Sequence, residues 1–463
     1  MAIRLRGLAV VGALLVLVAA TNILAAPPTG GTGPGGLYST DGTSNLVLWL
    51  RADKGVSLGG GTEVMTWADQ SGYGHNASGS VGSTPDLVTG ASGINGMPAL
   101  NFVNANDEYL SGYLNPPSPG TDLDDVTLTT VVQLELGSRS TIFAMGSSSP
   151  PHYPDGYDYF GFGLKDEGSG AYWHHDSRNN GSWAGYMDVR GGNFTPDTDP
   201  HMTAWTDYAS TGARTLHVDG SLASNDGGQD RYNNPGQVST YSVGSATDLW
   251  EYGGLISEVI LHKSALNGAE RVILDNVLSS KYGINMLAGD HYSEGTGDYR
   301  LDVFGLGQSG SDSVTSAGAG GMGFEITSTL ADGDWAFAGH NTTTNGVTTF
   351  ALGERWERVW FIDFSGEDVD GTLAFDLNSA AFTDPEAGEY RLLYSGSDPY
   401  SWDVAPYVAT VDGNTVSFSV STTDLPTEDG YFTLGVVPES GSLLLLLSAG
   451  AMLLLGRRKG GTR

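Results

Sequence analysis

Short runs of β-branched and aromatic residues, separated by Gly, Asn and Asp, recur along most of this 463-residue chain. These runs have the length of β-strands, and the residues between them favour tight turns. Asp219-Gly220 follows one run directly and is typical of a two-residue hairpin turn. Helical periodicity is nearly absent, so we predict an all-β fold made of sandwiches. The strands predicted up to residue 287 include Leu46–Leu50, Val126–Leu134, Thr141–Met145, Tyr159–Leu164, Met202–Tyr208 and Thr215–Val218.

One helix is predicted near the end of this region. Asn267 can cap its N-terminus, and Glu270 stands at the spacing of a capping box. Gly283 is placed to end it. We expect one face of this helix to pack on the sandwich, because its apolar residues form a single stripe. The stripe consists of Ile273, Leu274, Val277 and Leu278.

Both ends of the region between residues 45 and 287 resemble a known family. The segments Asn45–Asp53, Val64–Ala77 and Gly96–Phe102 are similar to the opening of laminin-G-like, concanavalin A-type lectin/glucanase domains. Gly253–Leu266 and Asn267–Ile284 are similar to the closing part of such domains. The resemblance implies a jelly-roll sandwich of two stacked antiparallel sheets. It does not imply a ligand, because one fold carries many functions.

A second β-rich domain is predicted over residues 288–436. Val411–Val420 indicates a hairpin with an Asp-Gly turn, and Gly307–Gly323 is predicted to be an exposed loop. This region resembles an uncharacterised β domain that follows laminin-G-like modules in bacterial surface proteins, through Phe304–Gly307, Gly339–Asn341 and Tyr431–Leu434. The predicted strands are Leu301–Leu306, Phe324–Thr329, Asp334–Gly339, Arg358–Phe364, Thr372–Leu377, Tyr390–Tyr394 and Tyr431–Val436.

The N-terminal 44 residues are predicted to serve export rather than the fold. Arg4 and Arg6 precede the apolar run Leu8–Ala20, and small residues follow, so residues 1–26 have the pattern of a secretory signal peptide. An uncleaved membrane anchor is the alternative. Residues 27–44 are rich in Pro, Gly, Ser and Thr, which is typical of a flexible linker.

The last 27 residues, 437–463, contain three parts in a fixed order. Val437-Pro438-Glu439 is followed by an apolar segment over residues 442–456 and then by Arg457-Arg458-Lys459. Fifteen helical residues span about 22 Å, less than the roughly 30 Å hydrocarbon core of a bilayer, so any insertion would be marginal. The tail resembles the PEP-CTERM sorting signal of Gram-negative bacteria, with Ser440 in place of the second Pro. The resemblance implies export through the secretion machinery, transient inner-membrane insertion and processing by an exosortase.

The charge of the chain excludes several classes of function. The formal net charge is −32, and once the six cations and one acid of the two ends are set aside, 15 cations face 52 acids, a net charge of −37. Such a body repels a phosphate backbone, which argues against nucleic-acid binding. The absence of Cys excludes disulfides, Cys-ligated zinc and a thiol nucleophile.

Catalytic motifs are not found. Glucanases of this fold carry Glu-x-Asp-x-x-Glu on one strand, and no such motif occurs. Glu258 stands alone in an apolar run and is predicted at a strand end or rim. Gly55–Gly59 matches a serine-hydrolase elbow, but Gly60-Gly61 follows where a helix is required, so we take the match as chance. We therefore predict a protein that is not an enzyme.

We interpret the acid-rich loops as solvated surface rather than as metal-binding sites. On a strand, His174 and His175 would point to opposite faces, so the pair is poorly placed to hold one metal ion, and we interpret both as exposed polar loop residues. A structural calcium ion is the alternative for the acid-rich loops, because hard cations prefer oxygen ligands. The candidate ligands are Asp122, Asp124, Asp125, Asp155 and Asp158, and Asp197-Thr198-Asp199 has a similar composition.

A sugar-binding site is expected to have aromatic platforms in loops, with adjacent amides or acids that bond the hydroxyl groups. Tyr157, Tyr159, Trp173 and Trp183 are the candidates, although ordinary packing is an equal alternative for the two tryptophans. Trp49, Trp67, Trp356 and Trp360 are predicted to lie in the core, the last two on one face of one strand.

Together these patterns predict an exported protein of the cell surface or extracellular matrix. We expect a non-catalytic carbohydrate-binding or adhesion role, with extracellular polysaccharide as the partner. The first alternative is a purely structural surface component without a specific ligand, and the second is a glucanase-type glycoside hydrolase.

Overall fold

The computed structural model describes most of the chain between residues 32 and 438. Not described are residues 1–31, 115–124, 137–139, 147–158, 167–170, 180–181, 190–194, 209–210, 227–239, 246–250, 294–297, 367–368, 383–384, 397, 422–428 and 439–463. The predicted signal peptide and nearly all of the predicted sorting tail therefore lie outside the described residues. Within them the fold is antiparallel β-structure with one α-helix.

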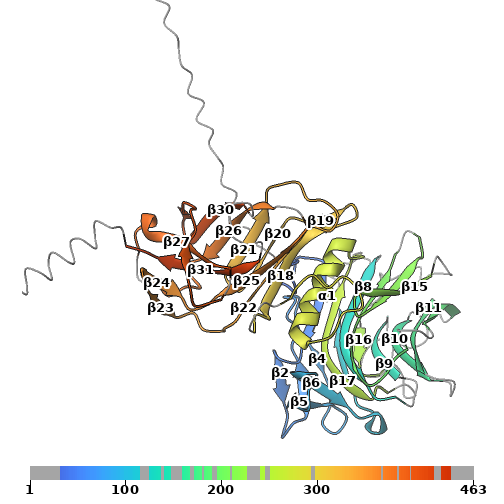
Figure 1. Cartoon of the computed structure of the whole chain (residues 1–463). Coiled ribbons are helices and arrows are strands. Elements are labelled where there is room, and N and C mark those ends of the chain that lie inside the picture. The colour runs from blue at the N-terminus through green and yellow to red at the C-terminus, as the bar shows by residue number, and fades with distance from the viewer. Residues whose placement is uncertain are drawn as a thin grey trace, which may run out of the picture.

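The first domain is a sandwich of two antiparallel sheets, as the resemblance implied (Figure 1). An apolar core fills the space between the sheets and contains Trp67, Phe143 and Trp205. The first sheet has the order β15-β14-β13-β8-β17-β6-β5, with β1 also paired to β17. Its strands are β1 Leu46–Arg51, β5 Asp86–Gly90, β6 Gly96–Phe102, β8 Val126–Leu134, β13 Pro200–Asp207, β14 Arg214–Val218, β15 Ser221–Asp226 and β17 Gly254–His262.

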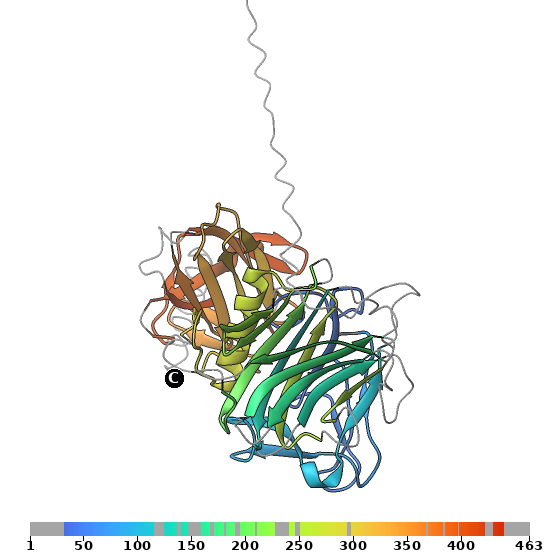
Figure 2. The same cartoon turned by 90° about the vertical axis from the view of Figure 1, so that its right-hand side faces the viewer.

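The second sheet of this domain has the order β12-β11-β10-β9-β16-β7-β4-β3-β2. Figure 2 shows the strands of the domain running side by side. The predicted turn is confirmed at Asp219-Gly220, where both residues have positive φ (49° and 78°). The strands of the second sheet are β2 Val56–Leu58, β3 Val64–Trp67, β4 Ala77–Ser78, β7 Leu110–Tyr113, β9 Ser140–Gly146, β10 Tyr159–Asp166, β11 Ala171–Asn179, β12 Ser182–Val189 and β16 Thr240–Val243.

The predicted helix is α1, Gly268–Tyr282, and its caps are confirmed. The Asn267 side chain accepts from the Glu270 N–H, and the Glu270 side chain accepts from the Asn267 N–H, both at 2.9 Å. Gly283 closes the helix with φ of 59°, a conformation that costs glycine little. Local sequence therefore sets both ends of α1.

Helix α1 is buried on two sides, which the sequence analysis did not predict. Leu274 and Leu278 pack on the first sheet beside Trp49 and Ile260, as expected for one apolar stripe. Ala269, Val272, Ile273 and Val277 pack instead against residues of the second domain, among them Val303, Trp335 and Phe337. The helix therefore lies between the two domains and contacts both (Figure 1).

Residues 33–38 are packed between the domains, so the prediction of a flexible linker is wrong for this part of 27–44. Gly33–Leu37 are buried, and the Gly305 N–H donates to the Gly35 carbonyl at 3.3 Å. Tyr38 donates its hydroxyl proton to Glu270 at 2.8 Å. At Gly35, φ is 75° and an added Cβ would lie 2.9 Å from Ile273. Glycine is thus required there by close approach to α1.

The second domain is also a sandwich, which confirms the predicted fold class. Phe304, Trp360, Phe375 and Phe418 fill its core. Its larger sheet follows the order β19-β18-β22-β25-β31-β24-β23, with β27 also paired to β31 and β28 paired to β27, and its smaller sheet follows β20-β21-β26-β30-β29. The larger sheet contains β18 Leu301–Ser309, β19 Asp312–Val314, β22 Trp335–His340, β23 Val347–Phe350, β24 Gly353–Trp356, β25 Trp360–Ser365, β27 Tyr390–Ser395, β28 Asp403–Val404 and β31 Gly430–Val436. The smaller sheet contains β20 Ser316–Ala319, β21 Met322–Ile326, β26 Asp370–Asp376, β29 Thr410–Asp412 and β30 Thr415–Ser421.

Two local predictions in the second domain need correction. The predicted loop 307–323 is wrong, because β18 continues to Ser309 and two further strands, β19 and β20, follow before β21. Trp356 and Trp360 are fully buried, with ring centroids 4.9 Å apart, which confirms their core position. They end β24 and begin β25, however, and so do not share a strand. The hairpin predicted within 411–420 is confirmed by β29 and β30.

Replacing Ile273 with Ala tests whether α1 couples the two domains. Deleting most of a fully buried side chain costs about 2–5 kcal/mol, whereas Ile273→Val costs about 0.5–1.5 kcal/mol. Because α1 contacts both sandwiches, we expect both domains to melt together at a lower temperature in scanning calorimetry. A first domain that melts early while the second keeps its original transition would contradict this coupling.

Candidate functional site

The aromatic strand β11 is part of the core rather than an open sugar platform. Trp173 is 1% exposed and stacks on Phe162 with ring centroids 6.0 Å apart. The predicted sugar-binding role is therefore wrong for Trp173, and the packing alternative holds. Alternation along the strand explains this, since Trp173 and His175 both point inward between the sheets.

His174 and His175 are buried on β11, which corrects the prediction of exposed loop residues. His175 is 1% exposed and packs on Phe160 and Trp205. Burial lowers the pKa of its imidazole well below the usual value, so it is neutral. The His174 ring instead bonds Asp188 at 2.7 Å. The two rings have different partners, as expected for adjacent strand residues.

Several predicted site residues cannot be placed. Tyr157, Asp122, Asp124, Asp155 and Asp158 lie outside the described residues. Tyr159 begins β10 and Trp183 lies on β12, but only their backbones are described. Asp125 directly precedes β8.

Neither a metal cluster nor a membrane-spanning helix is found in the described part of the chain. No group of three or more His, Asp or Glu side chains is placed there to hold a metal ion, and calcium stays a prediction. No helix there is both long and apolar enough to cross a membrane. The apolar segment 442–456, like Glu439 and Arg457-Arg458-Lys459, lies outside the described residues, while Val437 and Pro438 follow β31.

Glu258 is a buried hub and not a strand-end residue, so that prediction is wrong. It lies in β17 and is 1% exposed. Its carboxylate accepts from Trp49 Nε1 at 2.6 Å and from Lys281 Nζ and the Tyr282 hydroxyl, each at 2.7 Å. A single carboxylate saturated in this way ties β1 and α1 to β17 and has no geometry for catalysis.

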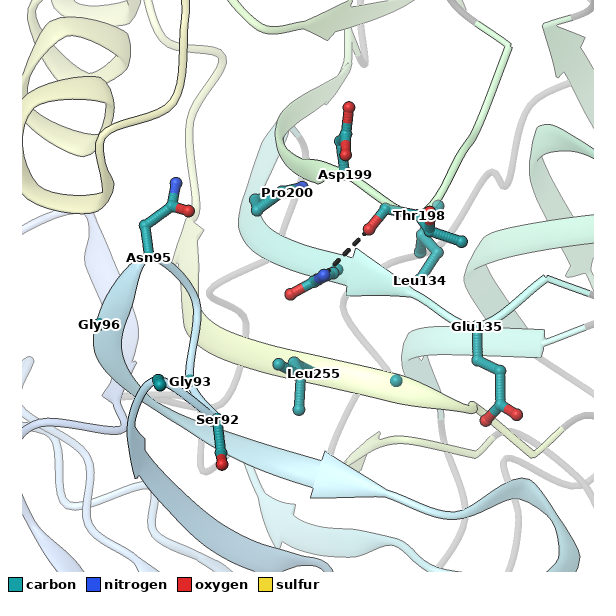
Figure 3. Close-up of a pocket in the computed structure, with 13 residues that line it drawn as sticks. Ser92, Gly93, Asn95, Gly96, Leu134, Glu135, Thr198, Asp199, Pro200 and Leu255 are labelled. Atoms are coloured by element: carbon teal, nitrogen blue, oxygen red, sulfur yellow. Dashed lines mark hydrogen bonds between the residues drawn. The ribbon is translucent and has the colours of Figure 1, made fainter.

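A solvent-open cleft lies on the first sheet, on the side that α1 covers. Its volume is about 650 Å³, and it crosses β13, β8, β17 and the β5–β6 hairpin (Figure 3). Helix α1 ends at Tyr282, and Asn95 of the hairpin donates to the Tyr282 carbonyl at 2.8 Å. We call this space the sheet cleft. It exists because a 15-residue helix of about 22 Å covers only part of the sheet.

Two walls face each other across Leu255 in the sheet cleft (Figure 3). One wall is the β5–β6 turn, and the other is formed by the end of β8 and the start of β13. Gln133 fixes the second wall, because its side-chain amide donates to the Thr198 carbonyl at 3.0 Å. The lining residues are Ala91, Ser92, Gly93, Asn95, Gly96, Gln133, Leu134, Glu135, Thr198, Asp199, Pro200, Gly254 and Leu255.

The lining of the sheet cleft is polar and acidic. Glu135 and Asp199 are both exposed, and no Lys, Arg, His or aromatic side chain is among the 13 lining residues. Amide, hydroxyl and carboxylate groups there offer hydrogen-bond partners for a hydroxylated ligand, with Leu255 as an apolar contact. The charge disfavours an anionic ligand.

Sequence reasoning missed this cleft almost entirely. Only Thr198 and Asp199 stood in a segment singled out for its oxygen ligands. Apart from Pro200, the other lining residues come from residues 91–96, 133–135 and 254–255, and the signals at Asn95-Gly96 and Gly253-Gly254 indicate turns rather than a site. No local pattern shows that these turns meet beside the end of α1.

Comparisons with known proteins leave the family open. No family model matches the chain, and no curated protein matches it. Solved structures that are similar include the Ruminococcus gnavus IT-sialidase CBM40 bound to α2,3 sialyllactose, at 13% identity and a TM-score of 0.26, covering 32% of this chain and 80% of that one. Another is domain 4 of AbnA, a GH43 extracellular arabinanase from Geobacillus stearothermophilus, in complex with arabinotriose, at 15% identity and a TM-score of 0.28, covering 42% and 81%.

A longer match is the binding domain of Botulinum neurotoxin DC in complex with rat synaptotagmin II. It shows 11% identity and a TM-score of 0.36 and covers 86% of this chain and 96% of that one. Similarity at these values assigns neither a ligand nor an activity to this chain.

Replacing Gly254 with Ala tests the backbone of the sheet cleft. Gly254 has φ of 128°, and an added Cβ would lie 2.3 Å from the Gln133 carbonyl oxygen. We therefore expect the substitution to lower the free energy of unfolding by about 1–3 kcal/mol. Gly60→Ala is the matched control, since nothing lies within 4 Å of its added Cβ, and it should stay within about 0.5 kcal/mol of the parent. Urea unfolding measures both, and equal stability of the two variants would show that the cleft tolerates a side chain here.

Proposed function

We propose that this chain is an exported surface or matrix protein that binds polysaccharide without cleaving it, and that the sheet cleft holds the saccharide. The observation that carries the proposal is the polar, solvent-open lining of that cleft on a rigid sheet. Strand ends position Gln133, Glu135 and Asp199, so little ordering entropy would be lost on binding.

The chemistry of the lining favours neutral sugars. The carboxylates of Glu135 and Asp199 accept hydrogen bonds from hydroxyl groups, and the hydroxyls of Ser92 and Thr198 can donate or accept. With no cation in the lining, an acidic sugar would meet repulsion. Because no aromatic platform is present there, we expect weak binding at each site. Repeated sugar units along a polymer would raise the overall affinity.

Binding is favoured over hydrolysis because both carboxyl groups are exposed. The general acid of a glycosidase is kept protonated by its surroundings, commonly by burial in an apolar pocket. Glu135 and Asp199 lie at the solvent-exposed rim, so neither has such surroundings. Glu258 is buried and accepts hydrogen bonds from three donors, which indicates a structural role rather than a catalytic one.

A panel of neutral and acidic polysaccharides, probed with the purified chain, tests the proposal. We expect saturable binding to a neutral polysaccharide, weakened at least about fivefold by Gln133→Ala and by Asp199→Ala, because each removes a hydrogen bond of about 1 kcal/mol or more. Ser57→Ala, an exposed residue of β2 within the segment that matches the hydrolase motif, is the control and should bind normally.

Loss of binding in the control as well, or no binding to any polysaccharide, would favour the structural alternative. Release of reducing ends that Glu135→Gln abolishes would instead establish a glucanase.

Export and sorting form the second part of the proposal and rest on the sequence pattern alone. We expect deletion of residues 437–463 to send the protein into the culture medium unprocessed, whereas the parent chain is found at the envelope with its tail removed. Cell fractionation with mass spectrometry of the C-terminus measures this. If the parent chain had the same location and mass in a host that lacks an exosortase, the proposed sorting role would be wrong.

A further inference from the structure

A second cleft, between the two domains, gathers an unusual share of the basic residues. Arg51 and Lys54 of the first domain, Lys281 of α1 and Arg300 of the second domain all line it. Only 15 cations stand between the two ends of the chain, against 52 acids. Four of them at one small space is far from what this composition would place there by chance. We call this space the interdomain cleft.

The interdomain cleft is small and partly enclosed. Its volume is about 190 Å³, less than a third of the 650 Å³ of the sheet cleft, so it fits one small group rather than a polymer segment. Residues 32–35 form one side, and Trp49, Gln70 and Thr40 add an aromatic ring, an amide and a hydroxyl. Hydrogen-bonding groups other than charges are therefore present as well.

The carboxylates around these cations already accept hydrogen bonds from other groups. Asp53 receives a two-pronged contact from Arg51, at 3.0 and 2.7 Å, and a third from Lys281 at 3.3 Å. The charged donors hold the pKa of Asp53 at about 2 although burial acts in the opposite direction. Glu258 receives Lys281, Trp49 and Tyr282, as described above. These two acids are saturated within their own domain.

Lys54 and Arg300 are the most exposed of the four cations. Within the described part of the chain Lys54 forms no ion pair. Arg300 pairs with Asp298, whose side chain is 73% exposed, and such a surface pair contributes little. The remaining acid in the lining, Asp302, bonds the buried His340 at 2.9 Å and has φ of 47°, a left-handed conformation held by that contact. Lys54 and Arg300 line the cleft from opposite domains, so one bound anion can lie near both.

We propose that the interdomain cleft binds the carboxylate of a single acidic sugar residue, a uronic acid. The carboxylate lies between Lys54 and Arg300, and the sugar hydroxyls meet Thr32, Thr40 and Gln70. The site is distinct from the sheet cleft, whose lining is acidic, so either site can fail without the other.

Glucuronate and glucose make a matched pair of probes, because they differ only by the carboxylate at one carbon. Calorimetric titration of the full chain should show saturable glucuronate binding and none for glucose at the same concentration. Lys54→Ala and Arg300→Ala should each weaken glucuronate binding about tenfold, since a charge-assisted hydrogen bond is lost. Arg391→Ala, a cation of the second domain outside the cleft, is the control and should bind like the parent.

Gln133→Ala should leave glucuronate binding unchanged, which separates this result from any failure in the sheet cleft. Binding of glucose equal to that of glucuronate would overturn the proposal. So would an absence of glucuronate binding, or a loss in Arg391→Ala that matches the loss in Lys54→Ala, because the effect would then come from net charge alone.

Discussion

The burial of α1 on two sides is the interaction on which the rest of the molecule depends. One side of the helix completes the first sandwich through Leu274 and Leu278, and the other meets the second domain through Val272 and Ile273. A helix exposed on one side would leave a continuous apolar stripe in water. The second domain is therefore needed to cover the helix, and the two sandwiches form one structural unit rather than two independent modules. The buried segment around Gly35 fits beside α1 only because the two domains hold the helix in place.

The same helix positions both clefts. Its C-terminal end stops beside Asn95 and leaves the sheet cleft open, whereas its Lys281 reaches the interdomain cleft. Glu258 connects these regions, because it bonds Lys281 and Tyr282 on α1 and Trp49 on β1. Removing one partner from such a buried pair generally costs about 3–5 kcal/mol, so the carboxylate is better understood as a structural link than as a catalytic group.

Local patterns in the sequence predicted what local forces decide. The Asn267–Glu270 capping box, the Asp219-Gly220 turn and strand β8 all depend on residues a few positions apart, and all are confirmed. Glu258 was misplaced because one partner, Trp49, lies 209 positions away. His174 and His175 were misjudged because polarity suggested a loop, whereas aromatic neighbours from β10 and β13 enclose His175. The sheet cleft depends on where α1 ends over distant strands, and no short motif carries that information.

The positions of the cations in the fold show which charges remain at the surface. Arg214 is fully buried, Arg358 is 7% exposed between two tryptophan rings, and Arg51 and Lys281 are bound to Asp53 and Glu258. Arg214, Arg51 and Lys281 are each paired with an acid, Asp207, Asp53 and Glu258 respectively, so these charges cancel and the excess of acids remains on the solvent-facing surface. Such a surface repels acidic polymers over a Debye length of about 8 Å at physiological salt. A neutral polymer can approach the sheet cleft freely, whereas the basic residues that line the interdomain cleft, Lys54 and Arg300 among them, would attract the carboxylate of an acidic sugar.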